Sequence, residues 1–195
     1  TQLSAKVLDN VNVTLVGVVN SDNSFVFPDF RSTERGFQLL TQVAGRAGRG
    51  RFGGSVVFQT FNPDFSAINS AKEQNYQKFY EEEIALRKEF GYPPFSKVVR
   101  FIVSGKEEGR VYQAAKEISD RLKQLVRDNN REDKIEAGSA AACAYEKINN
   151  DYRYEILTKN FADREGHKFL AKFFKTIKLP SDLKIKIDIS PIDLL

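Results

Sequence analysis

The segment Gly91-Tyr92-Pro93-Pro94 divides the chain into two stretches with separate folding patterns. Proline lacks an amide hydrogen and its ring clashes with the preceding helical turn, so neither proline can continue a helix. Each side of this break carries a hydrophobic pattern of its own, as independent domains do. We therefore predict three parts: residues 1–64, a connecting helix with its proline break at 65–94, and a second domain at 95–195.

The first part has the pattern of the end of a parallel α/β sheet. Residues 11–19 (VNVTLVGVV) form a nearly continuous β-branched run, which predicts a strand buried on both faces. A helix capped by Ser32 or Thr33 follows, and residues 55–60 (SVVFQT) predict a second buried strand. Strand, helix, loop and strand in this order indicate a parallel sheet. One helix of about 25 residues is then expected up to Phe90.

The second part alternates between strand and helix periodicities. Its last strand is the clearest, because apolar and polar residues alternate strictly from Leu183 to Ile189. We expect, in order, a strand at 97–104, a helix at 107–126, a short strand at 135–138, a strand at 152–159, a helix at 163–177 and a strand at 183–189. The order β-α-β-β-α-β predicts a ferredoxin-like α+β domain.

Composition excludes several classes of protein. The single cysteine, Cys143, rules out an internal disulfide and a multi-cysteine zinc site, and we expect no metal site in this chain. No stretch approaches the roughly 20 apolar residues of a membrane span, which predicts a cytoplasmic protein. The net charge of +4 permits a polyanionic partner without requiring one. The sequence begins at Thr1 almost directly before a strand, so we interpret it as part of a longer protein.

The most informative segment for chemistry is residues 42–49 (QVAGRAGR). Arg46 and Arg49 are three residues apart at a helix end, which places them on one face. Arginine suits a phosphoryl group, because its planar fork makes bidentate, charge-assisted hydrogen bonds. The neighbouring glycines allow a close approach of the backbone to an anion. From these residues alone, a basic surface turn is an equally good interpretation.

In its context, QVAGRAGR resembles motif VI of superfamily 2 helicases, and Thr1 to Lys6 with Asp9 resembles their motif V. The segment at 27–40 narrows the resemblance to the primosomal replication-restart helicases, the PriA family. Within it, the charged residues suit a structural ion-pair cluster or a functional one equally well: Arg31, Glu34 and Arg35. Further matching segments extend the resemblance over nearly the whole chain: residues 53–63, 82–87, 92–95, 152–153 and 187–191.

The resemblance implies a RecA-like parallel-sheet helicase lobe, of which this chain holds the C-terminal portion, followed by the ferredoxin-like domain. It implies that Arg46 and Arg49 contact the γ-phosphate of ATP as the catalytic arginines. Further roles follow from it: nucleotide binding by Asp9, Gln42 and Gly45, and DNA binding by Thr1, Gln2 and Lys6. ATP with Mg²⁺ is expected in the whole protein, and the ATP cradle and the zinc-binding insertion of the family are expected upstream of Thr1.

The second domain is expected to bind partners. Tyr152, Arg153, Tyr154 and Lys159 alternate aromatic and basic side chains along one strand, a pattern able to stack bases and hold phosphates. The alternative, which we favour, is that the tyrosines and Ile156 face the core. The family resemblance implies forked or branched DNA, single-stranded DNA, single-stranded DNA-binding protein and primosome proteins as partners. It assigns the partner contact to Arg153 and Lys159, in a cytoplasmic, nucleoid-associated protein.

Two functional hypotheses follow. The first is a fragment of an ATP-dependent 3′-to-5′ DNA helicase that acts in replication restart and primosome assembly, and that is inactive as an isolated chain. The second is a non-catalytic module, derived from such a helicase, that binds DNA or a partner. Val7 and Asn10 favour the second, because they depart from the glycine and the aromatic residue of the family's motif V.

Overall fold

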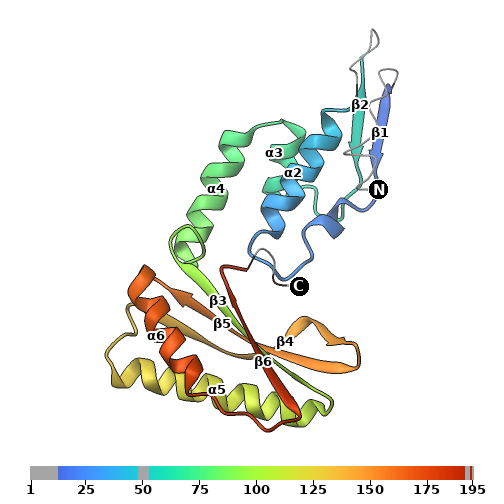
Figure 1. Cartoon of the computed structure of the whole chain (residues 1–195). Coiled ribbons are helices and arrows are strands. Elements are labelled where there is room, and N and C mark those ends of the chain that lie inside the picture. The colour runs from blue at the N-terminus through green and yellow to red at the C-terminus, as the bar shows by residue number, and fades with distance from the viewer. Residues whose placement is uncertain (1–12, 48–52, 192–193, 195) are drawn as a thin grey trace. The chain divides into compact units, whose positions relative to one another are not determined.

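A computed structural model describes residues 13–47, 53–191 and 194 of the chain. The chain forms two compact units, Thr1–Leu86 and Arg87–Leu195, and each is described separately. Both units combine helices with a sheet, which confirms the α/β class (Figure 1). The predicted three-part division of the chain remains a prediction.

Unit 1 is built on two parallel strands joined through a helix (Figure 1). The strands pair from Leu15 with Ser55 to Val18 with Phe58, in the parallel arrangement that the sequence predicted. Its elements in chain order are β1 (Leu15–Val18), the short 3₁₀ helix η1 (Ser21–Ser24), α2 (Ser32–Ala44), β2 (Ser55–Phe58), α3 (Ser66–Lys72) and α4 (Tyr76–Glu89).

The core of unit 1 lies between its helices. The ring of Phe37 on α2 stacks on Phe79 of α4 with centroids 4.1 Å apart, and Leu40 and Ile68 pack in the same cluster. Burial alternates along both strands, and Val57 is 58% exposed. The prediction of strands buried on both faces is therefore wrong for the described residues. A β-branched run does not distinguish one covered face from two.

The predicted helix of about 25 residues is also wrong, because it is two helices. Gln74 adopts a left-handed conformation with φ of 51° between α3 and α4. Its amide donates to the Ala71 carbonyl at 3.2 Å, and the Asn75 amide donates to the Ser70 carbonyl at 2.8 Å. This is a Schellman end to α3. The Asn75 side chain then accepts a hydrogen bond from the Lys78 amide at 3.0 Å and caps α4.

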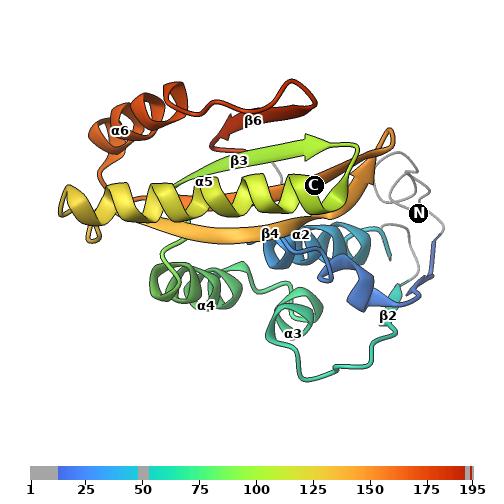
Figure 2. The same cartoon turned by 90° about the horizontal axis from the view of Figure 1, so that it is seen from below.

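Unit 2 is a four-stranded antiparallel sheet in the order β4-β5-β3-β6. The predicted order β-α-β-β-α-β is confirmed by β3 (Lys97–Gly105), α5 (Glu108–Asp128), β4 (Ile135–Ile148), β5 (Asp151–Asn160), α6 (Asp163–Lys175) and β6 (Leu183–Ile189). Figure 2 shows α5 lying across one face of this sheet. Side chains of both helices join Phe101 and Ile156 of the central strands in one buried cluster.

Strand β4 has 14 residues, so the short strand predicted at 135–138 is wrong in length. Its pairing with β5 shifts register between Ala137 and Ala140 and again between Ala142 and Lys147. Such irregularities take residues out of the pattern of period two, which hides the strand from sequence analysis. The turn into β5 uses Asn149 and Asn150, both at positive φ, as a tight hairpin requires.

Gly138 in the first irregularity of β4 is expected to be intolerant of a side chain. A Cβ at this position would lie 2.3 Å from the Leu157 carbonyl oxygen, whereas a Cβ at Gly109 on α5 would meet nothing within 4 Å. Gly138→Ala should destabilise unit 2 by about 1–3 kcal/mol. Gly109→Ala should stabilise it slightly, by up to about 1 kcal/mol, because alanine favours a helix over glycine.

Urea unfolding of the 195-residue chain, followed by circular dichroism, measures both substitutions at Gly138 and Gly109. Opposite signs are expected for the two changes in midpoint. Equal midpoints would show that β4 relaxes around the new methyl group at no cost, and would contradict the fixed approach of the two strands.

Candidate functional site

The candidate site at the end of α2 brings together Gln42, Gly45 and Arg46. Gln42 and Arg46 are four residues apart, so they share one face of the helix end. Gln42 is exposed and Arg46 is half-buried. The amides of Gly45 and Arg46 donate to the carbonyls of Thr41 and Val43, both at 3.0 Å, so the turn after α2 is ordered through Arg46.

Gly45 itself has no conformational reason to be glycine in the described structure. Its φ of −68° suits any residue, and a Cβ would meet the Thr41 carbonyl oxygen at an ordinary 3.5 Å. The fold therefore leaves space around this backbone that a side chain would fill. The role of Gly45 in letting an anion approach closely stays a prediction.

Topology places this site at one edge of the parallel pair. The Ser55 amide donates to the Thr14 carbonyl at 2.8 Å, which joins the starts of β1 and β2. The chain enters both strands at this edge, and Arg46 precedes β2. The remaining predicted residues of the nucleotide and DNA sites lie outside the described residues, so their roles stay predictions: Thr1, Gln2, Lys6, Asp9 and Arg49.

A cavity of about 540 Å³ begins beside this helix end. It runs from Ala44 and Ala47 along β2 to Asn69 and Lys72 of α3. Its volume falls within the range of small-molecule pockets, and its lining mixes apolar side chains with two amides and an ammonium group. Sequence analysis missed this cavity, because its walls come from three elements that no sequence motif joins.

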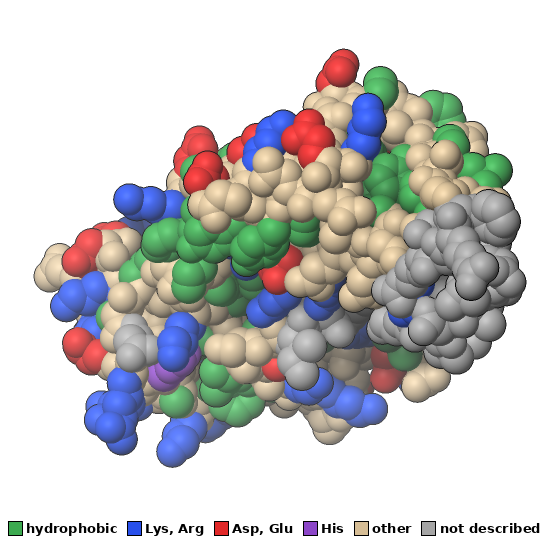
Figure 3. Space-filling view, turned by 90° about the horizontal axis from the view of Figure 1, so that it is seen from above, with side chains coloured by type: hydrophobic (Ala, Val, Ile, Leu, Met, Phe, Trp, Pro, Cys, Tyr) green, Lys and Arg blue, Asp and Glu red, His purple; other side chains and the backbone are tan. Residues whose placement is uncertain are grey.

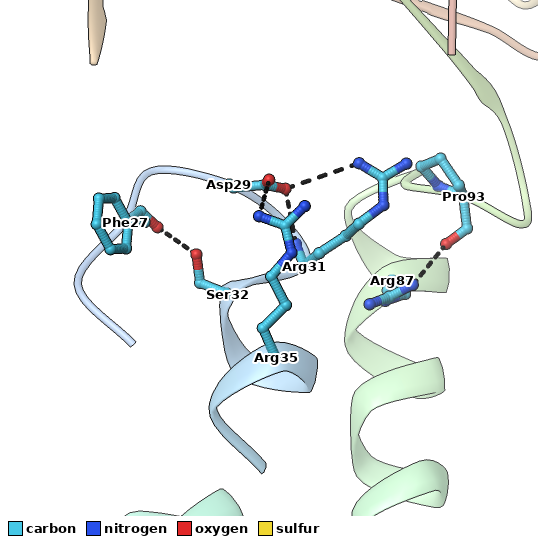
Figure 4. Close-up of polar contacts among 7 residues, drawn as sticks. All are labelled: Phe27, Asp29, Arg31, Ser32, Arg35, Arg87 and Pro93. Atoms are coloured by element: carbon cyan, nitrogen blue, oxygen red, sulfur yellow. Dashed lines mark hydrogen bonds and ion pairs between the residues drawn. The ribbon is translucent and has the colours of Figure 1, made fainter. Parts of the chain in front are cut away.

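The start of α2 carries a second polar cluster, centred on Asp29 (Figure 4). The Asp29 carboxylate is fully buried, accepts a hydrogen bond from the Arg31 amide at 2.9 Å, and lies 3.1 Å from the Arg35 guanidinium. The Arg31 guanidinium stacks over the Phe30 ring at 4.0 Å. These contacts match the structural alternative for the arginines of this segment.

The capping residue of α2 was predicted wrongly. Arg31 is the N-cap, and no side chain caps the helix from that position. The Ser32 hydroxyl instead donates to the Phe27 carbonyl, as Figure 4 shows. The Asp29 carboxylate takes the place of a cap, because it accepts from the amide of Arg31 itself.

In unit 2, Lys159 holds the first residues of the unit in place. Its ammonium group donates to the Phe90 carbonyl at 2.8 Å, pairs with Glu136 at 3.0 Å and lies 4.7 Å from the Tyr92 ring centroid. Only 14% of the Lys159 side chain is exposed. In the same segment, the Arg87 guanidinium donates to the Pro93 carbonyl (Figure 4). These contacts are structural, and the predicted partner contact of Lys159 stays untested.

The tyrosines of β5 face the core, as favoured from the sequence. Tyr152 and Tyr154 pack against the central cluster, and Ile156 is fully buried within it. The Tyr154 hydroxyl donates to Glu108 at 3.1 Å, and burial together with this carboxylate raises the pKa of Tyr154. Arg153 alternates to the opposite face, where it donates to the Tyr145 carbonyl at 3.4 Å. The tyrosines, which the sequence pattern suggested as a platform for bases, therefore lie on the opposite face of the sheet from Arg153.

Sequence analysis also missed a buried ion pair on that opposite face. Arg100 of β3 is 2% exposed and pairs with Glu155 of β5. Burial, and secondarily the nearby Glu155 carboxylate, raises the pKa of the Cys143 thiol. An elevated pKa keeps this thiol protonated, as is typical of a structural cysteine. The only sequence signal was a single arginine inside an otherwise apolar strand.

Among residues 13–47, 53–191 and 194, no three histidine, cysteine, aspartate or glutamate side chains are grouped to hold a metal ion. In the same part of the chain, every helix is too short or too polar to cross a membrane.

Comparison with known proteins identifies the family. Residues 88–192 match the model of the primosomal protein N C-terminal domain. The replication restart protein PriA of Borreliella burgdorferi is 36% identical over 197 residues, which cover 100% of this chain and 29% of that protein. PriA of Bacillus subtilis is 38% identical over 194 residues, which cover 98% of this chain and 24% of that protein. The chain thus spans only about a quarter of the length of these relatives. It belongs to the family of the replication restart protein PriA and corresponds to its C-terminal part.

Proposed function

We propose that this chain is part of an ATP-dependent 3′-to-5′ DNA helicase that acts in replication restart and primosome assembly at stalled forks. The observation that carries the proposal is the ordered end of α2, where Gln42, Gly45 and Arg46 lie together at the edge where both parallel strands begin. The resemblance of this segment to motif VI makes Arg46 the arginine proposed to reach a nucleotide held by another lobe. The names of the relatives support the restart role.

The proposed role of Arg46 is to bind the γ-phosphate of ATP and stabilise the charge that develops there. A guanidinium group is permanently charged and makes two parallel hydrogen bonds to phosphate oxygens. In the proposal, ATP supplies the phosphoryl group and Mg²⁺ neutralises part of its charge. Zinc is proposed to bind residues outside this chain. Gln42, on the same helix face, would couple the nucleotide to DNA, while Arg49 and Asp9 complete the proposed nucleotide contacts.

Exposure of the strands in unit 1 supports its assignment to a larger helicase lobe. Leu15 and Val57 are 65% and 58% exposed, and Phe61 after β2 is 90% exposed. Figure 3 shows hydrophobic side chains open to the surface on the face seen there. A two-stranded sheet is marginally stable alone, and exposed apolar residues on it suit further strands or a covering element.

The proposed partners are forked or branched DNA, single-stranded DNA, single-stranded DNA-binding protein and other primosome proteins, in the bacterial cytoplasm near the nucleoid. Of the two predicted contact residues, Arg153 remains in the proposal, because its guanidinium lies on the face away from the helices. Thr1, Gln2 and Lys6 are proposed to lie along the DNA backbone.

The experiment that tests the function uses the full-length protein and forked DNA with either a 3′ or a 5′ single-stranded tail. The expected result is ATP-dependent unwinding from the 3′ tail. DNA binding without ATP hydrolysis would instead establish the alternative, a non-catalytic binding module. The 195-residue chain is expected to hydrolyse no ATP in either case, because phosphate contacts are needed from residues that it does not contain.

A further inference from the structure

Asp29 joins the loop after β1 to the first turn of α2. Its carbonyl accepts a hydrogen bond from the Ser32 amide at 2.8 Å, and its carboxylate accepts one from the Arg31 amide at 2.9 Å. Its own amide donates to the Phe27 carbonyl at 2.8 Å. The amides at a helix start have no partners inside the helix, and Asp29 satisfies two of them. The loop therefore meets α2 through directional hydrogen bonds that fix where the helix begins.

The ion pair of Asp29 with Arg35 adds a constraint on the rotation of α2. Arg35 lies one turn along the helix from Arg31, and its amide donates to the Arg31 carbonyl at 2.9 Å. Its guanidinium lies 3.1 Å from the Asp29 carboxylate (Figure 4). One carboxylate thus contacts both the entrance of α2 and a side chain on one face of its first turn. Rotation of the helix about its axis would carry Arg35 away from Asp29.

A second contact holds the same loop against α2. The Phe25 ring lies so close to Gly36 that a Cβ at Gly36 would collide with it. The same ring packs edge-on against Phe65, with the ring centroids 4.9 Å apart. A side chain at position 36 would push the loop away from the helix, so this approach requires glycine. The loop is therefore fixed to α2 at two points, Phe25 and Asp29.

The placement of α2 by Asp29 extends to the far end of the helix. α2 spans 13 residues, about 20 Å at 1.5 Å per residue, and contains no proline. It continues into an ordered turn, in which the Arg46 amide donates to the Val43 carbonyl at 3.0 Å. A continuous helix moves as one body, so a rotation or shift at its start also displaces Arg46. An error of about 1 Å in the position of a catalytic group can cost about 100-fold in rate.

We propose that Asp29 is a positioning residue for Arg46. It sets the rotation and the axial position of α2, and thereby places the Arg46 guanidinium where charge develops on the transferred phosphoryl group. Arg35 completes the device by holding the Asp29 carboxylate on one side of the helix. The inference rests on the proposed function of Arg46 and adds a residue that acts through it, not on the substrate.

The first test measures DNA-stimulated ATP turnover of the full-length protein with Asp29→Ala and Asp29→Asn. Asp29→Ala should lower kcat at least about tenfold, because Arg46 is misplaced relative to the transition state. The KM for ATP should stay within about threefold, since ground-state binding changes little. Asp29→Asn keeps an acceptor for the Arg31 amide but loses the charge, so its kcat should be intermediate.

Variants of Arg35 test the same device at an exposed side chain, where substitution does not threaten folding. Arg35→Gln removes the ion pair with Asp29 and should lower kcat in the same direction as Asp29→Asn. Arg35→Lys keeps the positive charge and should recover most of the lost turnover. Equal turnover in wild type and in Arg35→Gln would remove Arg35 from the device, and wild-type turnover in Asp29→Ala would overturn the proposal.

The decisive experiment is a double-mutant cycle between Asp29→Ala and Arg46→Ala. If Asp29 acts through Arg46, the double variant should turn over ATP as fast as Arg46→Ala alone. If the two losses multiply instead, Asp29 acts independently of Arg46 and the proposal is wrong. Wild-type turnover in Arg46→Ala would refute the proposed function itself, whereas wild-type turnover in Asp29→Ala alone would refute only this inference.

A control variant separates positioning from a general loosening of unit 1. Ala67→Gly removes a methyl group that is 2% exposed in α3 and weakens that helix without altering the start of α2. Its kcat should stay within about twofold of the wild type. A loss of kcat in Ala67→Gly as large as that in Asp29→Ala would show that loosened packing is sufficient, and would overturn the specific role of Asp29.

Discussion

Replacing Arg46 by alanine in the full-length protein is expected to lower DNA-stimulated ATP turnover by at least about two orders of magnitude. An arginine in this role acts on charge that develops in the transition state, so its loss reduces kcat while substrate binding changes little. DNA affinity should stay within about threefold of the wild type, because the proposed DNA contacts involve other residues. Steady-state phosphate release and DNA titration measure the two quantities separately.

Two further variants make this result specific. Arg46→Lys keeps the charge but loses the planar fork, so it should recover only part of the turnover. Lys116→Ala removes an exposed charge from α5 and should leave turnover unchanged. If Arg46→Ala retains turnover near that of the wild type, the assignment of motif VI to this helix end is wrong.

The elements predicted best from the sequence are those whose periodicity reflects burial directly. The strand from Leu183 to Ile189 has the predicted bounds, because its alternation reports one covered face and one open face. The five other elements predicted in unit 2 exist in the predicted order. The predicted boundaries were wrong where local hydrogen bonds determine the end of an element. Gln74 ends α3 in a conformation that glycine usually adopts, so no residue type marks the end of this helix in the sequence.

The length of β4 depends on distant pairing. Residues 138–144 are small and mostly polar or alanine, with little strand preference of their own. They extend β4 because β5 supplies partners, as in the pairing of Ala140 with Ile156. A local pattern contains no information on such a partner, and the sequence prediction therefore stopped at residue 138.

The polar residues likewise include some whose arrangement the sequence predicts and some whose arrangement it does not. The shared face of Gln42 and Arg46 follows from helix geometry, so the sequence was sufficient to predict it. The pair of Arg100 and Glu155 joins residues 55 positions apart. Only the register of β3 and β5, in which Ile102 lies opposite Glu155, brings the two side chains diagonally together on one face.

This buried pair leads to a second large expected effect, on stability. Glu155→Ala removes the carboxylate that pairs with the Arg100 guanidinium, which is only 2% exposed. Breaking a buried pair from one side costs about 3–5 kcal/mol, because the remaining charge stays desolvated. The exposed pair of Arg110 and Asp182 is the matched control, since both side chains are nearly half exposed. Asp182→Ala should cost no more than about 1 kcal/mol.

The double variant Arg100→Met/Glu155→Leu separates the cost of a buried charge that has lost Glu155 from the value of the pair. Replacement of both partners by apolar side chains of similar volume removes the desolvation penalty together with the attraction. The double variant should therefore be more stable than Glu155→Ala alone, by several kcal/mol. Urea unfolding, read at the transition of unit 2, gives all four free energies. Equal costs for Glu155→Ala and Asp182→Ala would mean that water reaches Arg100. A double variant less stable than Glu155→Ala would mean that the polar pair itself, through its hydrogen bonds, holds β3 against β5.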